Sequence, residues 1–137
     1  MTKNIVGFLV FFFVMLVIDG IWLSLIARNF YKANIGQFLA EKPDWFAAAL
    51  FFVIFTTGVS VFVVWPCLQN GDILRAALLG ALFGLVTYAT YDLTNQATLK
   101  EWPKLVTLVD LCWGTALTSF VSFIAVFTTT YFFKAGS

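Results

Sequence analysis

Three aspartates of this chain stand in strongly apolar surroundings. Asp19 and Asp110 interrupt long apolar runs, and Asp92 lies at the end of another. Acids inside a membrane are rare and usually mark the path of an ion, a proton or a substrate. Acids that only join helices gain on average about 0.6 kcal/mol per hydrogen bond, whereas inserting one aspartate costs roughly 2.5–3.5 kcal/mol. A functional role is therefore favoured over a purely structural one.

Asp19 and Asp110 belong to the same short pattern. Residues 17–22 read VIDGIW and residues 108–113 read LVDLCW, so a tryptophan follows each acid at a spacing of three. That spacing places carboxylate and indole on one helix face, and an indole N–H donates to a carboxylate of its own or a neighbouring helix. In antiparallel helices the pattern would be the remnant of an inverted repeat.

Two stripes of mostly small or polar residues predict which helix faces meet. One stripe is Ala76, Gly80, Gly84, Tyr88 and Asp92, and the other is Asp110, Gly114, Thr118 and Ser122. Small residues at a spacing of four allow close helix approach, so both stripes are expected to face the bundle interior. The predicted ligand-binding residues are the three acids and their polar or aromatic neighbours: Asp19, Trp22, Tyr88, Tyr91, Asp92, Asn95, Asp110 and Trp113.

The composition indicates which elements must position these residues. Of the 137 residues, 61% are hydrophobic and 11% are charged, with a mean hydropathy of +0.94. Soluble domains are about a quarter charged, and a membrane helix needs about 20 apolar residues. The segments of that length are 5–27, 45–65, 73–95 and 105–133. They predict one domain over 1–137: an all-α, integral membrane, antiparallel four-helix transmembrane bundle.

The ends and faces of these segments carry further signals. The first segment is too long for a signal peptide, and Asp19 interrupts it. Pro66 is expected to end the second segment, which should contact mostly lipid. Its inward-facing residues would be Thr56, Thr57, Gly58 and Ser60, and the tryptophans at segment ends fit an aromatic belt: Trp45, Trp65 and Trp102.

Antiparallel threading brings the three acids into the same half of the bilayer. The first and third segments run in one direction and the fourth runs back, so Asp19, Asp92 and Asp110 all lie towards the first and third loops. That side carries five cations (Arg28, Lys32, Lys42, Lys100 and Lys104), and the other carries three (Lys3, Arg75 and Lys134). The positive-inside rule therefore favours both termini outside. Arg28 and Lys100 are candidate partners for the acids.

Several classes of function are disfavoured. The net charge is +1 and no basic run follows a phosphate backbone, so nucleic acid is not an expected partner. Histidine is absent, which removes His-based metal sites, haem ligation and a His general base. Cys67 and Cys112 are predicted near opposite membrane faces, so neither a disulfide nor a thiolate metal site is expected. We predict no cofactor and no metal, and the sequence assigns no catalytic residue.

One long stretch of the third segment and the loop after it is distinctive. Residues 88–103 read YATYDLTNQATLKEWP. With Phe30-Tyr31, Gly114 and the two Asp-x-x-Trp patterns, this stretch resembles a family of small predicted bacterial membrane proteins, defined only as a domain of unknown function. Its most specific part is Tyr-Asp-Leu-Thr-Asn, at 91–95. The resemblance implies a multi-pass protein of the bacterial inner (plasma) membrane and implies no particular activity.

The residues leave three functions open. The first is binding or transport of a small amphiphile or cation, linked to protons because neighbouring carboxyl groups in apolar surroundings retain them; a four-span carrier would work as a homodimer. The second is an enzyme that modifies a lipid or isoprenoid by acid/base chemistry at the aspartates. The third is an accessory subunit whose acids pair with a partner helix. Membrane lipids are expected partners in each case.

Overall fold

Helices make up most of the computed structural model, which describes residues 1–135. Helix α1 (Thr2–Ile21) continues as a π-helical turn, η1 (Trp22–Ile26). The first connection holds α2 (Arg28–Ile35) and a short 3₁₀ helix, η2 (Gly36–Phe38). The second span consists of α3 (Trp45–Val59), the π-helical turn η3 (Ser60–Val64) and α4 (Trp65–Asn70). The third and fourth spans are α5 (Ile73–Thr98) and α6 (Lys104–Ala135).

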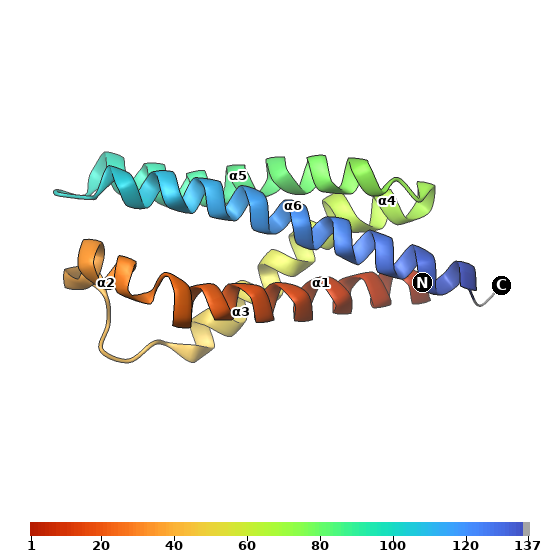
Figure 1. Cartoon of the computed structure of the whole chain (residues 1–137), viewed down its shortest axis with the longest axis horizontal. Helices are drawn as coiled ribbons and strands as arrows, with labels where there is room; N and C mark the ends of the chain where they lie inside the picture. The colour runs from red at the N-terminus through yellow and green to blue at the C-terminus, as the bar shows by residue number, and fades with distance from the viewer. Residues whose placement is uncertain (136–137) are drawn as a thin grey trace.

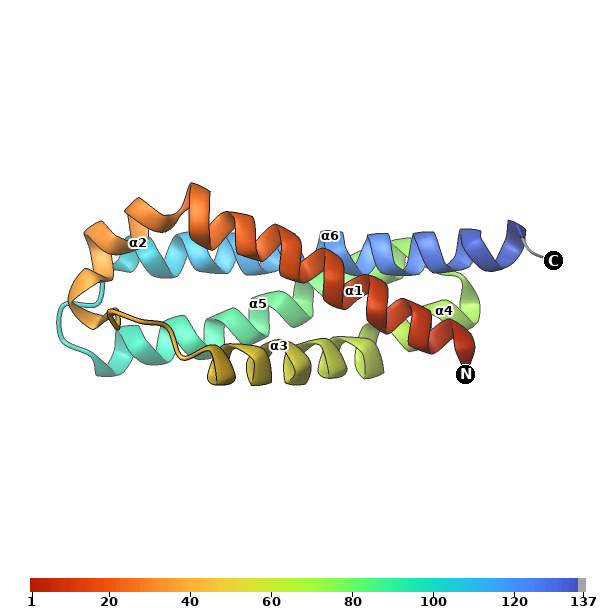
Figure 2. The ribbon, with the colours of Figure 1, turned by 90° about the horizontal axis from the view of Figure 1, so that it is seen from below.

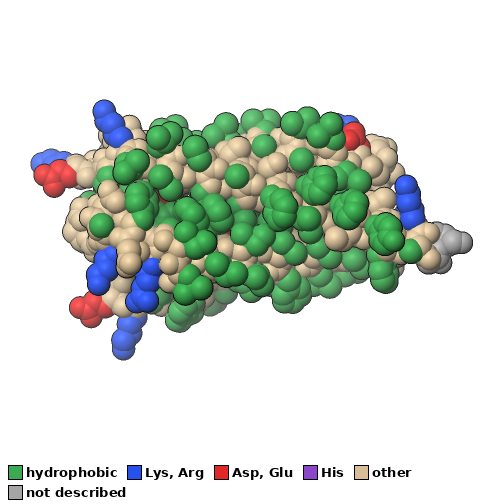
Figure 3. Space-filling view, viewed as in Figure 1, with side chains coloured by type: hydrophobic (Ala, Val, Ile, Leu, Met, Phe, Trp, Pro, Cys, Tyr) green, Lys and Arg blue, Asp and Glu red, His purple; other side chains and the backbone are tan. Residues whose placement is uncertain are grey.

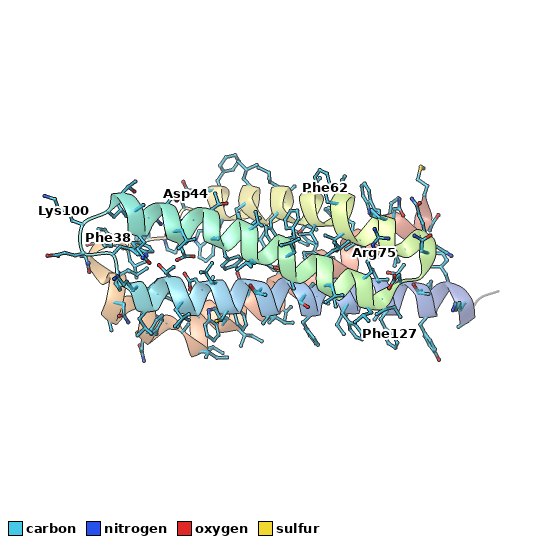
Figure 4. All side chains as sticks on the ribbon, turned by 90° about the horizontal axis from the view of Figure 1, so that it is seen from above. Phe38, Asp44, Phe62, Arg75, Lys100 and Phe127 are labelled. Atoms are coloured by element: carbon cyan, nitrogen blue, oxygen red, sulfur yellow. The ribbon has the colours of Figure 1, made fainter. Side chains whose placement is uncertain are left out.

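The outer surface has the polarity of a membrane protein. Within residues 1–135, four helical segments are long and apolar enough to cross a bilayer: Thr2–Ile26, Trp45–Asn70, Ile73–Thr98 and Lys104–Ala135. Hydrophobic side chains cover the middle of the molecule and charged ones gather at its two ends (Figure 3). Phe62 and Phe127 point away from the bundle in Figure 4, and they are 69% and 45% exposed. The predicted four-helix membrane fold is confirmed.

Helices α5 and α6 lie side by side along most of their length (Figure 1). A Cβ atom added to Gly80 would lie 2.6 Å from Ser122 Oγ, and one added to Gly84 would lie 2.7 Å from Thr118 Oγ1. Only glycine permits this approach, so each glycine lies against a small polar residue of α6. Both predicted stripes are therefore confirmed, and they face each other.

Helix α1 packs on α6, which it crosses obliquely (Figure 2), and α3 diverges from the α5–α6 pair. Phe11 and Met15 of α1 are fully buried in a core that also contains Val64 and Val121. Figure 1 shows α3 running obliquely: its last residues approach the α5–α6 pair, and its first half lies well away from it. The buried residues of the second span accordingly all lie in its later part, from Phe55 to Leu68.

Pro66 does not end the second span, contrary to the prediction. The helix continues through it to Asn70, with the proline at the start of α4 and directly after the π-helical turn η3. Proline breaks a helix because it lacks an N–H and its ring collides with the carbonyl four residues earlier. A wider π turn displaces that carbonyl, so the chain accommodates the ring. The span ends instead at Gly71, whose φ of 65° is left-handed.

Two other details differ from the sequence expectations. The third span runs to Thr98, beyond the predicted end at residue 95. Thr57 is exposed and donates to the Val53 carbonyl, so it does not face inward as predicted. The back-bond satisfies its hydroxyl within the helix, which removes the need for an interior position. Thr56 and Ser60 are fully buried as expected.

Candidate functional site

A cavity of about 550 Å³ lies where α3 diverges from the α5–α6 pair. This volume is typical of a small-molecule site. All four spans and the first connection contribute to its walls. The lining residues are Asp19, Trp22, Leu23, Arg28, Tyr31, Ile35, Leu39, Phe51, Phe55, Thr87, Tyr88, Tyr91, Asp110 and Trp113.

Two stacked indoles form one wall of the cavity. The rings of Trp22 and Trp113 lie 4.1 Å apart between centroids, with an interplanar angle of 11°. Trp22 begins the π-helical turn η1, and Trp113 precedes Gly114 on α6. A Cβ at Gly114 would lie 2.6 Å from Tyr88 Cδ1, so the absent side chain makes room for the Tyr88 ring. The two Asp-x-x-Trp patterns thus meet through their tryptophans.

The hydrogen bonds of the two patterns are crossed. Trp113 Nε1 donates to Asp19 Oδ1 at 3.0 Å. Trp22 Nε1 donates to the Tyr31 hydroxyl at 3.2 Å, and that hydroxyl donates to Asp110 Oδ1. Each indole therefore connects to the acid of the other pattern, once directly and once through a tyrosine. This arrangement holds both carboxylates at the same cavity wall.

Tyr31 is central to this hydrogen-bond network and was not among the ligand-binding residues predicted from the sequence. It lies on α2, outside the membrane-spanning segments, and links Trp22 to Asp110 across 79 positions of the sequence. Burial raises the pKa of its phenol above the ordinary value, and the hydrogen bond to Asp110 adds to this effect. The phenol therefore stays protonated and remains a donor. The Phe30-Tyr31 pair in the family resemblance was the available signal.

Asp92 lies behind the cavity and not in its wall. Its side chain is 0% exposed, and neither carboxylate oxygen accepts a hydrogen bond from an N–H or a hydroxyl of residues 1–135. Its carboxyl group lies beside that of Asp110, which faces the cavity. Asn95 also stays outside the lining and lies beside Tyr91. The other predicted ligand-binding residues all line the cavity.

The convergence of the acids is as the threading argument predicted. Asp19 and Asp110 act on each other electrostatically, and Asp110 and Asp92 are immediate neighbours. Besides Tyr31, seven lining residues were not among the predicted ligand-binding residues: Leu23, Arg28, Ile35, Leu39, Phe51, Phe55 and Thr87. Of these, Arg28 was expected only as a charge partner of the acids. No group of three or more His, Cys, Asp or Glu side chains able to hold a metal occurs in residues 1–135. The arrangement suits an organic ligand with an apolar part.

Removing the Tyr31 hydroxyl should destabilise the site. Tyr31→Phe deletes the donor to Asp110 and the acceptor for Trp22, so we expect a loss of about 0.5–2 kcal/mol in unfolding free energy. Tyr131→Phe is the control, because its side chain is 69% exposed at the other end of the bundle. Equilibrium unfolding in mixed micelles measures the change in unfolding free energy for both variants. An equal effect of the two substitutions would contradict the hydrogen-bond network.

Comparison with known proteins identifies a family. The model of the family described as predicted membrane protein (DUF2177) matches residues 4–127. No curated protein and no solved structure matches the chain in these comparisons.

Proposed function

The chain belongs to the DUF2177 family of predicted membrane proteins, and we propose that it binds a small amphiphile with a cationic headgroup in the cavity between its spans. The observation that carries this proposal is the placement of Asp19 and Asp110. Both carboxylates reach one apolar cavity, and each receives a hydrogen bond from a neutral donor. A cationic headgroup would supply the positive charge that neither donor provides.

The walls of the cavity suit such a headgroup. Trp22 and Trp113 stack on each other, and Tyr88 and Tyr91 add further aromatic surface. Aromatic faces attract ammonium groups by about 0.5–2 kcal/mol, depending on desolvation. Acids beside aromatic rings therefore favour an amine over a neutral headgroup of the same size.

The rim of the cavity suits an apolar chain. Leu23, Leu39 and Phe51 line it and are each nearly half exposed. In a membrane these side chains face the acyl region or its boundary, so a ligand chain that leaves the cavity there stays in apolar surroundings. A bound amphiphile would thus keep its headgroup at the acids and its tail in lipid.

The purely structural role is less consistent with this geometry. Acids that only hold helices together would lie in a dry interface with each carboxylate hydrogen-bonded. Here a cavity of about 550 Å³ adjoins two of the acids, so these two do not lie in a dry interface. Ligand binding accounts for the cavity, and the crossed hydrogen bonds account for how the acids are held.

A titration with matched amphiphiles tests the proposal. Dodecylammonium and dodecanol share one apolar chain and differ in headgroup charge. We expect dodecylammonium to bind the protein in maltoside micelles at least about tenfold more tightly, which corresponds to about 1.4 kcal/mol. The readout is the tryptophan fluorescence of the cavity wall. Equal affinity for the two compounds would contradict a role for the acids in binding.

Binding of a cation should also release a proton. Asp92 and Asp110 lie side by side, and two neighbouring carboxylates repel each other when both are ionised. A cation at the site favours the fully ionised pair, so we expect up to one proton released for each dodecylammonium bound. Asp92→Asn removes the second acid and should abolish most of this release. Release unchanged in the variant would exclude Asp92 as a partner in proton coupling.

A further inference from the structure

We infer that the preferred headgroup is zwitterionic, with its ammonium group at Asp19 and Asp110 and an anionic group, a phosphate or a carboxylate, at Arg28. The inference rests on the proposed function, because it names the ligand class of the same cavity. The observation that carries it is that one cavity contains separate charges of opposite sign.

Arg28 is the only cationic residue among those that line the cavity. It is the first residue of α2, directly after the buried Ala27 that ends the π-helical turn η1. No ion pair joins it to Asp19 or Asp110 in the described part of the chain. The guanidinium charge therefore remains available to a ligand.

The order of the charges along the first span sets the orientation of the headgroup. Asp19 precedes Arg28 and lies inside the span, whereas Arg28 follows its last residue, Ile26. The acids thus lie deeper in the membrane than the arginine. An ammonium group would enter first, and the anionic group would remain nearer the loops.

Arginine also discriminates between headgroups. Its planar guanidinium donates two parallel hydrogen bonds to a phosphate or a carboxylate, and it repels a simple cation. A plain alkylammonium would therefore meet attraction at the acids and repulsion at Arg28. A headgroup with both charges would satisfy both ends of the cavity.

An ammonium group joined to a phosphate or a carboxylate occurs in lipid headgroups and in free aminophosphates or amino acids. Four probes separate the effect of headgroup charge on affinity from the effect of the alkyl chain: dodecylphosphoethanolamine, dodecylammonium, dodecyl phosphate and free phosphoethanolamine. Each is titrated against the full-length protein in maltoside micelles, and bound ligand is counted by native mass spectrometry. The variants are Arg28→Gln and the matched control Lys32→Gln, since Lys32 lies one turn further along α2 and does not line the cavity.

For the wild type we expect dodecylphosphoethanolamine to bind about tenfold to a hundredfold more tightly than dodecylammonium. Arg28→Gln should remove this preference without weakening dodecylammonium binding, and Lys32→Gln should preserve it. Free phosphoethanolamine that binds as tightly as the dodecyl form would support the zwitterion and identify a soluble source. Thermal unfolding of Arg28→Gln verifies that the variant is folded.

Two results would overturn the inference in distinguishable ways. If dodecylammonium binds the wild type as tightly as the zwitterion, and Arg28→Gln changes neither affinity, Arg28 does not select the headgroup but the amphiphile site stands. The second result is that every probe has the same affinity for the wild type and for the double variant Asp19→Asn, Asp110→Asn. In that case the proposed function fails and the inference fails with it.

Discussion

Replacement of Gly84 by alanine is expected to disrupt the α5–α6 pair and to cost more than about 3 kcal/mol of unfolding free energy. The added Cβ would lie 2.7 Å from Thr118 Oγ1 and closer still to the Gly114 carbonyl oxygen. A backbone atom cannot rotate away, so the two helices would have to separate. Equilibrium unfolding in mixed micelles measures the loss.

Gly20 provides the matched control, because it is also a glycine within a membrane-spanning helix. A Cβ at Gly20 would have no neighbour within 4 Å. Alanine is the better helix former by about 1 kcal/mol, so Gly20→Ala should be neutral or slightly stabilising. A Gly84→Ala protein within about 0.5 kcal/mol of wild type would contradict the close approach of α5 and α6.

Loss of both cavity acids is expected to abolish binding of cationic amphiphiles. The double variant Asp19→Asn, Asp110→Asn keeps the shape of the side chains and removes both charges. Hydrogen bonds and ion pairs to charged groups contribute about 1.5–3 kcal/mol each, so two of them correspond to at least about a hundredfold in dodecylammonium affinity. Titration by tryptophan fluorescence in maltoside micelles gives the affinity.

The single variants separate the two positions. Asp19 accepts from Trp113 and Asp110 accepts from Tyr31, so each asparagine can still accept through its amide oxygen. We expect each single variant to lose about tenfold in affinity with little loss of stability. Asp44→Asn is the control, since Asp44 caps α3 outside the cavity. Wild-type affinity in the double variant would show that the acids do not bind the headgroup.

Regular features of the chain made much of the fold predictable. Length and hydropathy identified the four spans, and a spacing of four identified the stripes that pack α5 on α6. Antiparallel threading predicted that the acids converge, and Asp19 and Asp110 do line one cavity. These inferences work because a membrane satisfies the backbone only within helices, which leaves few arrangements.

The residues that complete the site were less predictable, because they lie where the chain is irregular. Tyr31 and Arg28 reach the cavity through α2, in a connection whose path depends on the π-helical turn η1 and on contacts far along the sequence. Pro66 was misread for a related reason, since the π turn before it removes the usual clash. Neither π turn has a distinct sequence pattern. Asp92 belongs to the stripe of α5 that packs on α6, and the spacing did not show that the cavity would leave it out.

The most direct test of the site is photolabelling with a dodecylammonium analogue that carries a diazirine next to its nitrogen. Labelled residues are mapped by mass spectrometry of protein in nanodiscs. Labels should concentrate on cavity residues from several elements, such as Trp22, Tyr31 and Trp113, and excess unlabelled dodecylammonium should remove them. Labels spread over outward-facing residues such as Phe62 and Phe127, and insensitive to competitor, would contradict a binding site built from the converging aspartates.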